Sequence, residues 1–130
     1  MRVPHSMSGT TVGILGLGLS GMAAANALAA AGARLWLHDD NAAPRDEVPQ
    51  GAQLCGWQDW PWDELPSMVI SPGIPHAPPQ PHPAAARAGE AGVEVISEIE
   101  IAMRAAPQAR IVAITGTNGK STTTALTGHC

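Results

Sequence analysis

The sequence contains no phenylalanine and no tyrosine, and four tryptophans supply all of its large aromatic side chains. Aliphatic residues must therefore fill the core, with alanine taking a large share, although hydrophobic residues still make up 45% of the chain. With 130 residues, the chain has room for one domain of ordinary size and little more.

Basic residues are also scarce. Seven Lys and Arg residues stand against 11 Asp and Glu residues, giving a net charge of −4. This balance argues against a nucleic-acid-binding surface, so phosphate binding would depend on oriented backbone amides and a few chosen cations. Only two cysteines occur, Cys55 and Cys130, and their spacing fits neither a metal site nor a redox motif. We expect reduced thiols and a cytoplasmic protein.

A long uninterrupted hydrophobic run is missing. Residues 11–33 carry no charge and superficially resemble a secretion signal or a membrane span. Gly13, Gly16, Gly18 and Gly21 break its apolar part and Asn26 interrupts the remainder, and a buried strand followed by a packed helix explains the pattern better. We therefore expect no targeting segment and no contact with a membrane.

The first motif of the chain is a glycine-rich turn between a predicted strand and a predicted helix. A strand over Thr11–Leu15 leads into Gly16-Leu-Gly-Leu-Ser-Gly21, a helix follows over Ser20–Ala31, and a second strand covers Ala33–His38. Asp39 stands 23 residues after Gly16, near the place where dinucleotide-binding folds carry a ribose-binding acid. The motif predicts a ribonucleoside diphosphate site. The structural alternative is a tight turn packed by glycines, with Asp39 as a cap.

The middle of the chain continues the alternation of strands and helices. It predicts a short strand near Ala52–Leu54, a strand over Met68–Ser71, a helix over Ala84–Ala91 ended by Gly92, a strand over Val93–Ile96, and a helix to Ala106 capped by Ser97. Ile99 and Met103 are spaced to face one side of that last helix. Because ligands bind beyond the carboxyl ends of parallel strands, the turn Ser71–Pro75 should lie beside the Gly16 loop.

Two groups of side chains in this region suggest ligands but have simpler explanations. Trp57, Trp60 and Trp62 could form a platform for base stacking, yet a hydrophobic flap over the edge of the sheet is the better explanation. His76 and His82 have no partner at metal-ligand spacing, so we expect them to be surface residues.

The second motif, Ile111-Val-Ala-Ile-Thr-Gly-Thr-Asn-Gly-Lys-Ser-Thr-Thr124, reads as a strand, a glycine loop and the start of a helix. Ile111–Ile114 is predicted to be a buried parallel strand. Such loops hold nucleotide phosphates through backbone N–H groups, a lysine and a hydroxyl that can ligate Mg²⁺. The lysine here, Lys120, is the only one in the chain. A plain turn before a surface helix is the alternative.

In this second motif the first glycine of the general phosphate loop is shifted to Gly116, giving T-G-T-N-G-K-S-T. This form resembles the loop of the Mur ligase and folylpolyglutamate synthetase superfamily. Together with G-L-G-L-S-G, S-P-G-I and I-S-E-I-E in matching order, it resembles the Mur ligases that add D-glutamate, over residues 11–128. The resemblance implies an α/β fold: a Rossmann-like parallel sheet domain (11–107) after a disordered head (1–10), and then the start of a truncated P-loop ATPase-type central domain (108–130).

The same resemblance implies an ATP- and Mg²⁺-dependent ligase that joins D-glutamate to UDP-N-acetylmuramoyl-L-alanine through an acyl phosphate, in peptidoglycan precursor synthesis. We expect a monomer whose 130 residues are insufficient for activity. The implied UDP-sugar-binding residues are Gly18, Leu19, Ser20, Asp39, Asp40, Ser71, Pro72 and Gly73. The implied ATP-binding residues are Gly116, Thr117, Asn118, Gly119, Lys120, Ser121 and Thr122, with Lys120 catalytic and Ser121 on the metal.

Two other functions compete with this one. A stand-alone NAD-binding regulatory domain would need only the Gly16 motif and Asp39. Folate polyglutamylation would share the Lys120 loop but gives no reason for the Gly16 motif.

Overall fold

The computed structural model describes residues 9–41, 46–105 and 108–130. The predicted disordered head therefore lies largely outside the described residues, as does Ala106. The strands are β1 (Thr11–Leu15), β2 (Arg34–His38), β3 (Gln53–Leu54), β4 (Ser67–Ile70) and β5 (Glu94–Ser97). The helices are α1 (Leu19–Ala30), α2 (Pro83–Ala91), α3 (Glu98–Ala105) and α4 (Lys120–His129), and short 3₁₀ turns cover Trp57–Asp59 and Trp62–Glu64.

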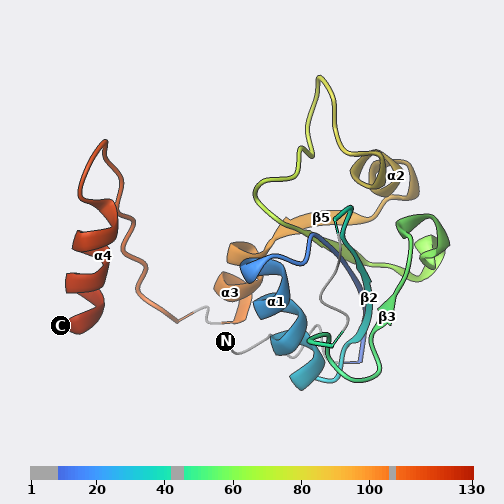
Figure 1. The fold of residues 1–130 in the computed structure, drawn as a ribbon, viewed down its shortest axis with the longest axis horizontal. Coiled ribbons are helices and arrows are strands. Elements are labelled where there is room, and N and C mark those ends of the chain that lie inside the picture. The colour runs from blue at the N-terminus through green and yellow to red at the C-terminus, as the bar shows by residue number, and fades with distance from the viewer. Residues whose placement is uncertain (1–8, 42–45, 106–107) are drawn as a thin grey trace.

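The strands form one sheet of five, in the order β3-β2-β1-β4-β5, and every neighbouring pair is parallel (Figure 1). β1 lies at the centre, and the chain moves outward from it on both sides. A ligand crevice is expected at such a switch in direction, beyond the carboxyl ends of β1 and β4. The predicted α/β, Rossmann-like fold is confirmed.

Each face of the sheet carries its own hydrophobic core, which gives three layers. Val12 and Ile14 of β1 pack with α1 and with Ile101 of α3, whereas Leu15 packs on the opposite face with α2. Successive strand residues point to opposite faces, so one central strand serves both cores. Small side chains dominate the buried faces of α1 and α2, as the lack of Phe and Tyr leads one to expect.

Trp60 and Trp62 are the largest buried side chains in the core on the α2 side. They are 4% and 7% exposed, and their rings lie 5.6 Å apart between centroids. The six-membered ring of Trp60 fills the space where a side chain on Gly13 of β1 would lie. A hydrophobic role is thus confirmed for this pair, but they cover the face of the sheet at its central strand rather than its edge.

The helix ends follow the predicted signals closely. α2 begins at Pro83 after His82 and ends at Gly92, which has a left-handed conformation with φ of 72°. At the start of α3, the Ser97 hydroxyl accepts a hydrogen bond from the Glu100 amide at 3.1 Å. The Glu100 carboxylate does not complete a capping box; it binds Arg104, which also pairs with Glu94.

The side of α3 that carries Ile99 and Met103 is not the buried one. Ile99 and Met103 do share one side of the helix, but they are 65% and 46% exposed. Ile101 is fully buried and packs against the α1 side of the sheet instead. Spacing alone identified a shared face without determining which face meets the core.

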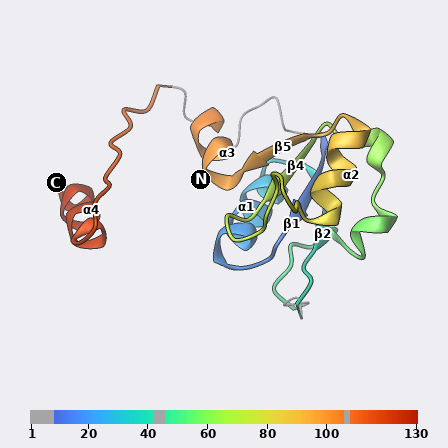
Figure 2. The same cartoon turned by 90° about the horizontal axis from the view of Figure 1, so that it is seen from above.

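The predicted strand Ile111–Ile114 is also wrong. These residues have no regular structure, and Ile111 and Val112 are 65% and 68% exposed. A parallel strand needs neighbours for its backbone groups, and none of the described strands pairs with this segment. α4 stands apart from the sheet in both views (Figures 1 and 2), and no residue of this helix is buried.

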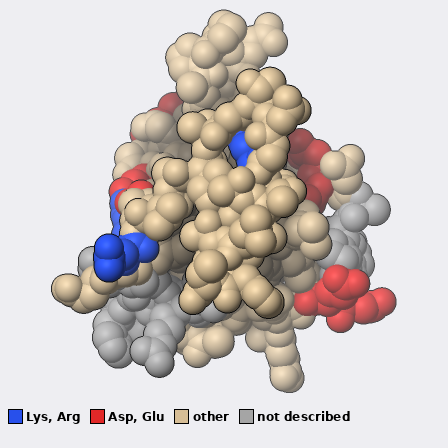
Figure 3. Space-filling view, turned by 90° about the vertical axis from the view of Figure 1, so that its left-hand side faces the viewer, with Lys and Arg blue, Asp and Glu red and all other residues tan. Residues whose placement is uncertain are grey.

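The surface agrees with the composition. Residues other than Lys, Arg, Asp and Glu predominate on the face nearest α4, and the basic and acidic residues form only small groups there (Figure 3). On this face there is no broad basic area among the described residues that would suit a nucleic acid. None of the described helices is both long enough and apolar enough to cross a bilayer.

Candidate functional site at the carboxyl edge of the sheet

Three loops meet where the central strands end. The Gly16 loop follows β1, the segment Asp39–Asn41 follows β2, and the Ser71 turn follows β4. The Gly16 amide donates a hydrogen bond to the His38 carbonyl at 2.8 Å, and the Ser71 amide donates to the Leu15 carbonyl at 3.0 Å. The predicted contact between the Ser71 turn and the Gly16 loop is confirmed.

The Gly16 loop is held by both of its neighbours. The Ser71 hydroxyl donates to the Gly16 carbonyl at 3.2 Å, and the Leu17 amide donates to Asp39 Oδ2 at 2.6 Å. Gly16 has φ of 93°, a left-handed conformation that favours glycine. The Leu17 side chain is buried in the core on the α1 side. The loop is therefore fixed by backbone geometry, by hydrogen bonds and by packing.

The first turn of α1 lies open at the end of this loop. Gly18 is the N-cap, no side chain among the described residues caps the helix, and its first turn contains no acidic residue. Beyond the adjoining stretch of backbone, no described atom lies within 4 Å of the position that a Cβ on Gly18 would take, and Leu19 is 95% exposed. The unpaired amides of a helix N-terminus attract anions, so this turn suits a phosphate group.

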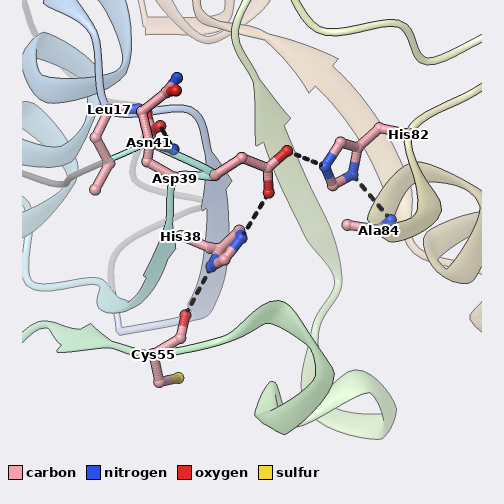
Figure 4. A network of polar contacts seen from close by, with 8 residues as sticks. Leu17, His38, Asp39, Asn41, Cys55, His82 and Ala84 are labelled. Carbon is pink, nitrogen blue, oxygen red and sulfur yellow. Dashed lines mark hydrogen bonds and ion pairs between the residues drawn. The ribbon is translucent and has the colours of Figure 1, made fainter.

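Asp39 joins the loop after β2 to the Gly16 loop. Its Oδ2 accepts from the Leu17 amide, and its Oδ1 accepts from the Asn41 amide at 2.8 Å (Figure 4). The capping role considered from the sequence is therefore confirmed. Each carboxylate oxygen has a second lone pair, so Asp39 can accept further hydrogen bonds from a ligand. Binding of a ribose by Asp39 stays a prediction.

Asp40 lies between two imidazole rings. Its Oδ1 is 2.9 Å from His38 Nε2, and its Oδ2 is 2.8 Å from His82 Nε2 (Figure 4). The hydrogen bonds from His82 and then His38 lower the pKa of the Asp40 carboxyl. The expectation that His82 is a plain surface residue is wrong, because its side chain is only 11% exposed and it caps α2. His76, by contrast, is exposed as predicted.

The sequence reasoning missed this pair of histidines as part of the site. His82 lies 42 residues from Asp40, and no motif spacing links the two positions. Its place before Pro83 at a predicted helix start was the available signal, since an N-cap side chain points back over the helix end. His38 carried a weaker signal, because it ends a strand at the ligand edge of the sheet.

Cys55 comes directly after β3, at the carboxyl end of this strand, and its carbonyl lies 3.2 Å from His38 Nδ1. Burial, together with the nearby charge of Asp59, raises the pKa of the Cys55 thiol. A raised pKa means less thiolate at neutral pH, and the thiolate is the form that reacts.

We expect a disulfide reagent at pH 7 to modify the exposed Cys130 at least about tenfold faster than Cys55. The rate at Cys55 should increase as the pH rises toward the raised pKa of its thiol. The release of the reagent's chromophore measures both rates, and Cys130→Ser should leave only the slow phase. Two equal rates at pH 7 would contradict the burial of Cys55.

The second predicted loop forms a turn followed directly by helix α4. Gly116 and Gly119 have φ of 149° and 77°, and Gly119 is the N-cap of α4. The Lys120 ammonium donates to the Gly116 carbonyl at 2.7 Å, so the loop closes on itself. Ser121 and Thr122 lie exposed in the first turn, which contains no acidic residue. Binding of ATP by Gly116–Thr122 stays a prediction.

Metal ligands of the usual kind do not gather in this site. Within the ranges 9–41, 46–105 and 108–130, no group of three His, Cys, Asp or Glu residues could hold a metal ion. Ser121 stays the predicted metal ligand. The domain boundary near residue 107 also stays a prediction, because residues 106–107 are outside the described ranges.

Two relatives of this chain carry the same enzymatic name. UDP-N-acetylmuramoylalanine–D-glutamate ligase of Rhodospirillum rubrum is 47% identical over 131 residues, which cover 96% of this chain. The enzyme of the same name from Phenylobacterium zucineum is 47% identical over 128 residues, covering 93% of the chain. The chain spans only 28% and 27% of the lengths of these relatives.

A solved structure supports the fold independently. Shikimate dehydrogenase from Aquifex aeolicus superposes with a TM-score of 0.53 over 75% of this chain and 45% of that one, at 13% identity. That identity is too low to say anything about function. The model of the Mur ligase MurD-like N-terminal domain matches residues 10–97, which is most of the chain. The chain therefore belongs to the Mur ligase family, and residues 10–97 correspond to its MurD-like N-terminal domain.

Proposed function

We propose that this chain is part of an ATP-dependent ligase that adds D-glutamate to UDP-N-acetylmuramoyl-L-alanine in peptidoglycan precursor synthesis. The observation that carries the proposal is the meeting of the Gly16 loop, Asp39 and the Ser71 turn at one edge of the sheet. The names of relatives that match almost the whole chain support the same conclusion. Because those relatives are more than three times longer, this chain supplies part of the machinery.

The edge of the sheet divides into two regions of opposite electrostatic character, and UDP has matching parts. The open first turn of α1, at Gly18, Leu19 and Ser20, attracts the diphosphate. Asp39 and Asp40 offer carboxylate oxygens that accept hydrogen bonds from the uracil N–H and the ribose hydroxyls. Carboxylates would repel a phosphate placed beside them, so this polarity fixes the direction in which the nucleotide lies.

The Ser71 turn provides a third side of this site. Ser71 contacts the Gly16 loop directly, while Pro72 and Gly73 are exposed beyond it. Pro72, Gly73 and the residues up to Ala77 line an open hollow of about 350 Å³. Because this hollow begins directly after Ser71, which contacts the Gly16 loop, it would give the uridine end of the ligand a wall to pack against.

The Gly116–Thr122 loop fits a nucleoside triphosphate in its chemistry. Its glycines have positive φ, its helix N-terminus carries no competing acid, and Lys120 already turns toward the loop. Gly116, Thr117, Asn118, Gly119 and Thr122 would hold phosphate oxygens through backbone amides, and Ser121 would ligate Mg²⁺. Bound ATP supplies the phosphoryl group that activates the alanyl carboxylate, and Lys120 neutralises charge on the transferred group.

A stand-alone NAD-binding domain is the second candidate, favoured by the place of Asp39 after the Gly16 motif. Titration calorimetry of the 130-residue chain with UDP-N-acetylmuramoyl-L-alanine and with NAD⁺ separates the two. We expect the UDP ligand to bind at least about tenfold more tightly than NAD⁺, a difference of about 1.4 kcal/mol. Asp39→Asn should weaken UDP binding, whereas Asp63→Asn, at an exposed acid of another segment, should leave it unchanged. Tighter binding of NAD⁺, lost in Asp39→Ala, would reject the ligase.

A further inference from the structure

His82 is the side chain that ties the end of β2 to the start of α2. Figure 4 shows its ring between the α2 backbone and the loop after β2. His82 Nδ1 lies 3.0 Å from the Ala84 amide, and His82 Nε2 lies 2.8 Å from Asp40 Oδ2. The Trp57 ring meets the His82 ring edge-on, with 6.4 Å between centroids and an angle of 74°.

These contacts determine which nitrogen of His82 carries the proton. The Ala84 amide can only donate, so Nδ1 of His82 must accept and therefore carries no hydrogen. In that tautomer Nε2 carries the hydrogen and donates it to the Asp40 carboxylate. The helix cap thus orients His82 as a hydrogen-bond donor toward the ligand edge of the sheet.

A metal site is the obvious alternative for two histidines around one carboxylate, and the same tautomer argues against it. A metal bound at Nε2 of His82 would require the hydrogen on Nδ1, which would then face the Ala84 N–H. His38 places Nδ1 at 3.2 Å from the Cys55 carbonyl and Nε2 at 2.9 Å from Asp40, so both of its nitrogens also have protein partners. The cluster is arranged to hold protein segments together.

The cluster of His38, Asp40 and His82 holds the end of β2, which is the segment predicted to contact the nucleoside. Asp39 and Asp40 are neighbours, and each ties the end of β2 to a different element. Asp39 binds the Leu17 amide of the Gly16 loop, and Asp40 binds His82 at the start of α2. The short stretch Asp39–Asn41 is therefore fixed from two sides, although Asp40 itself is 62% exposed.

We propose that His82 is a positioning residue of the uridine end of the site, acting through Asp40 on the stretch Asp39–Asn41. This inference rests on the proposed function for the identity of the ligand. The hydrogen-bond partners of the His82 side chain are Asp40 and the Ala84 amide, with none in the Gly16 loop and none at Asp39 among the described residues, so its effect passes through the Asp40 carboxylate. Loss of the His82 contact leaves the Asp40 carboxylate bound only to His38 of β2 itself, so Asp39 alone ties this stretch to another element. A ligand then has to order the stretch when it binds.

Two substitutions separate the cap of α2 from the contact with Asp40. In His82→Ser the hydroxyl still caps α2 but is too short to reach Asp40. His82→Ala removes both contacts. The measurements are NMR-detected exchange of the Leu17 and Asn41 amide hydrogens with solvent, the melting temperature, and the affinity for UDP by calorimetry. All are made on the 130-residue chain.

In His82→Ser we expect exchange at Leu17 and Asn41 to rise and the dissociation constant for UDP to rise, each about threefold to tenfold. The melting temperature should stay near that of the unchanged chain, and only His82→Ala should lower it clearly. The double variant Asp40→Ala/His82→Ser should exchange no faster at these amides than Asp40→Ala alone, because Asp40→Ala already breaks the contact with His82 along with the one to His38.

The outcomes are distinguishable. Unchanged exchange at Leu17 and Asn41 in His82→Ser overturns the proposal, and so does unchanged UDP affinity in a chain that binds UDP. If the unchanged chain binds no UDP, the proposed function fails, and faster exchange in His82→Ser still supports the positioning of this stretch by His82. Fully additive effects of Asp40→Ala and His82→Ser on amide exchange at Leu17 and Asn41 would also overturn the proposal.

Discussion

Replacing Gly21 by alanine is expected to lower the free energy of unfolding by about 3 kcal/mol, near the upper end for overpacking. A Cβ on Gly21 would overlap the Gly16 carbonyl and approach the Ser71 hydroxyl. The carbonyl belongs to a backbone that is fixed by hydrogen bonds to its neighbours, so it cannot move aside cheaply. Urea denaturation followed by tryptophan fluorescence measures the change.

Gly18→Ala is the matched control for this substitution. Gly18 lies in the same motif, but the position of its Cβ is open among the described atoms. We expect the free energy of unfolding of the Gly18→Ala variant to differ from that of the unchanged chain by less than about 0.5 kcal/mol, as at other exposed positions. If Gly21→Ala and Gly18→Ala lowered the free energy of unfolding equally, the close approach of Gly21 to the Gly16 carbonyl would not explain the need for glycine at position 21.

Replacing Trp60 by alanine should cost about 4 kcal/mol, as large-to-small changes of buried aromatic residues do. Trp60 is 4% exposed, contacts Trp62, and is the side chain that covers Gly13 on the central strand. Its loss leaves a cavity against β1 that alanine-rich neighbours cannot fill. Thermal and urea denaturation should both report the loss, with far-ultraviolet circular dichroism confirming that the variant is folded.

Two variants test whether the cost comes from the space over Gly13. Trp57→Ala, at a half-buried ring of the same cluster, should cost clearly less than Trp60→Ala. Gly13→Ala should destabilise the unchanged chain, because its Cβ would meet the Trp60 ring at 2.5 Å. In the Trp60→Ala background the same change should be neutral or stabilising. A Gly13→Ala cost that is equal in both backgrounds would contradict the packing described here.

The fold could be predicted from local patterns because each strand carries its own signal. The buried run Thr11–Leu15 before a glycine turn, and the capped start and glycine stop of α2, determine their elements within a residue or two. The parallel order of the sheet then brings the Gly16 loop and the Ser71 turn together. This part of the candidate site follows from topology and needs no knowledge of side-chain contacts.

Other features depended on contacts that no local pattern contains. The Asp40–His82 pair joins positions 42 residues apart, and either residue alone looks like an ordinary polar surface residue. Ile111–Ile114 has the composition of a buried strand, but hydrogen-bond partners decide whether such a run becomes one. For α3, the period showed which residues share a side, while the position of the sheet decided that Ile101 points inward.

The anchoring of Leu17 affects how favourably and how selectively the Gly16 loop binds an anion. Its amide is occupied by Asp39 and its side chain by the core, so the backbone leading into α1 has one conformation before any anion arrives. Such preorganisation spares an incoming phosphate the entropy cost of ordering the loop. The fixed conformation of the loop also sets the spacing of the remaining amides. Anions that match this spacing bind, whereas bulkier anions gain nothing from induced fit.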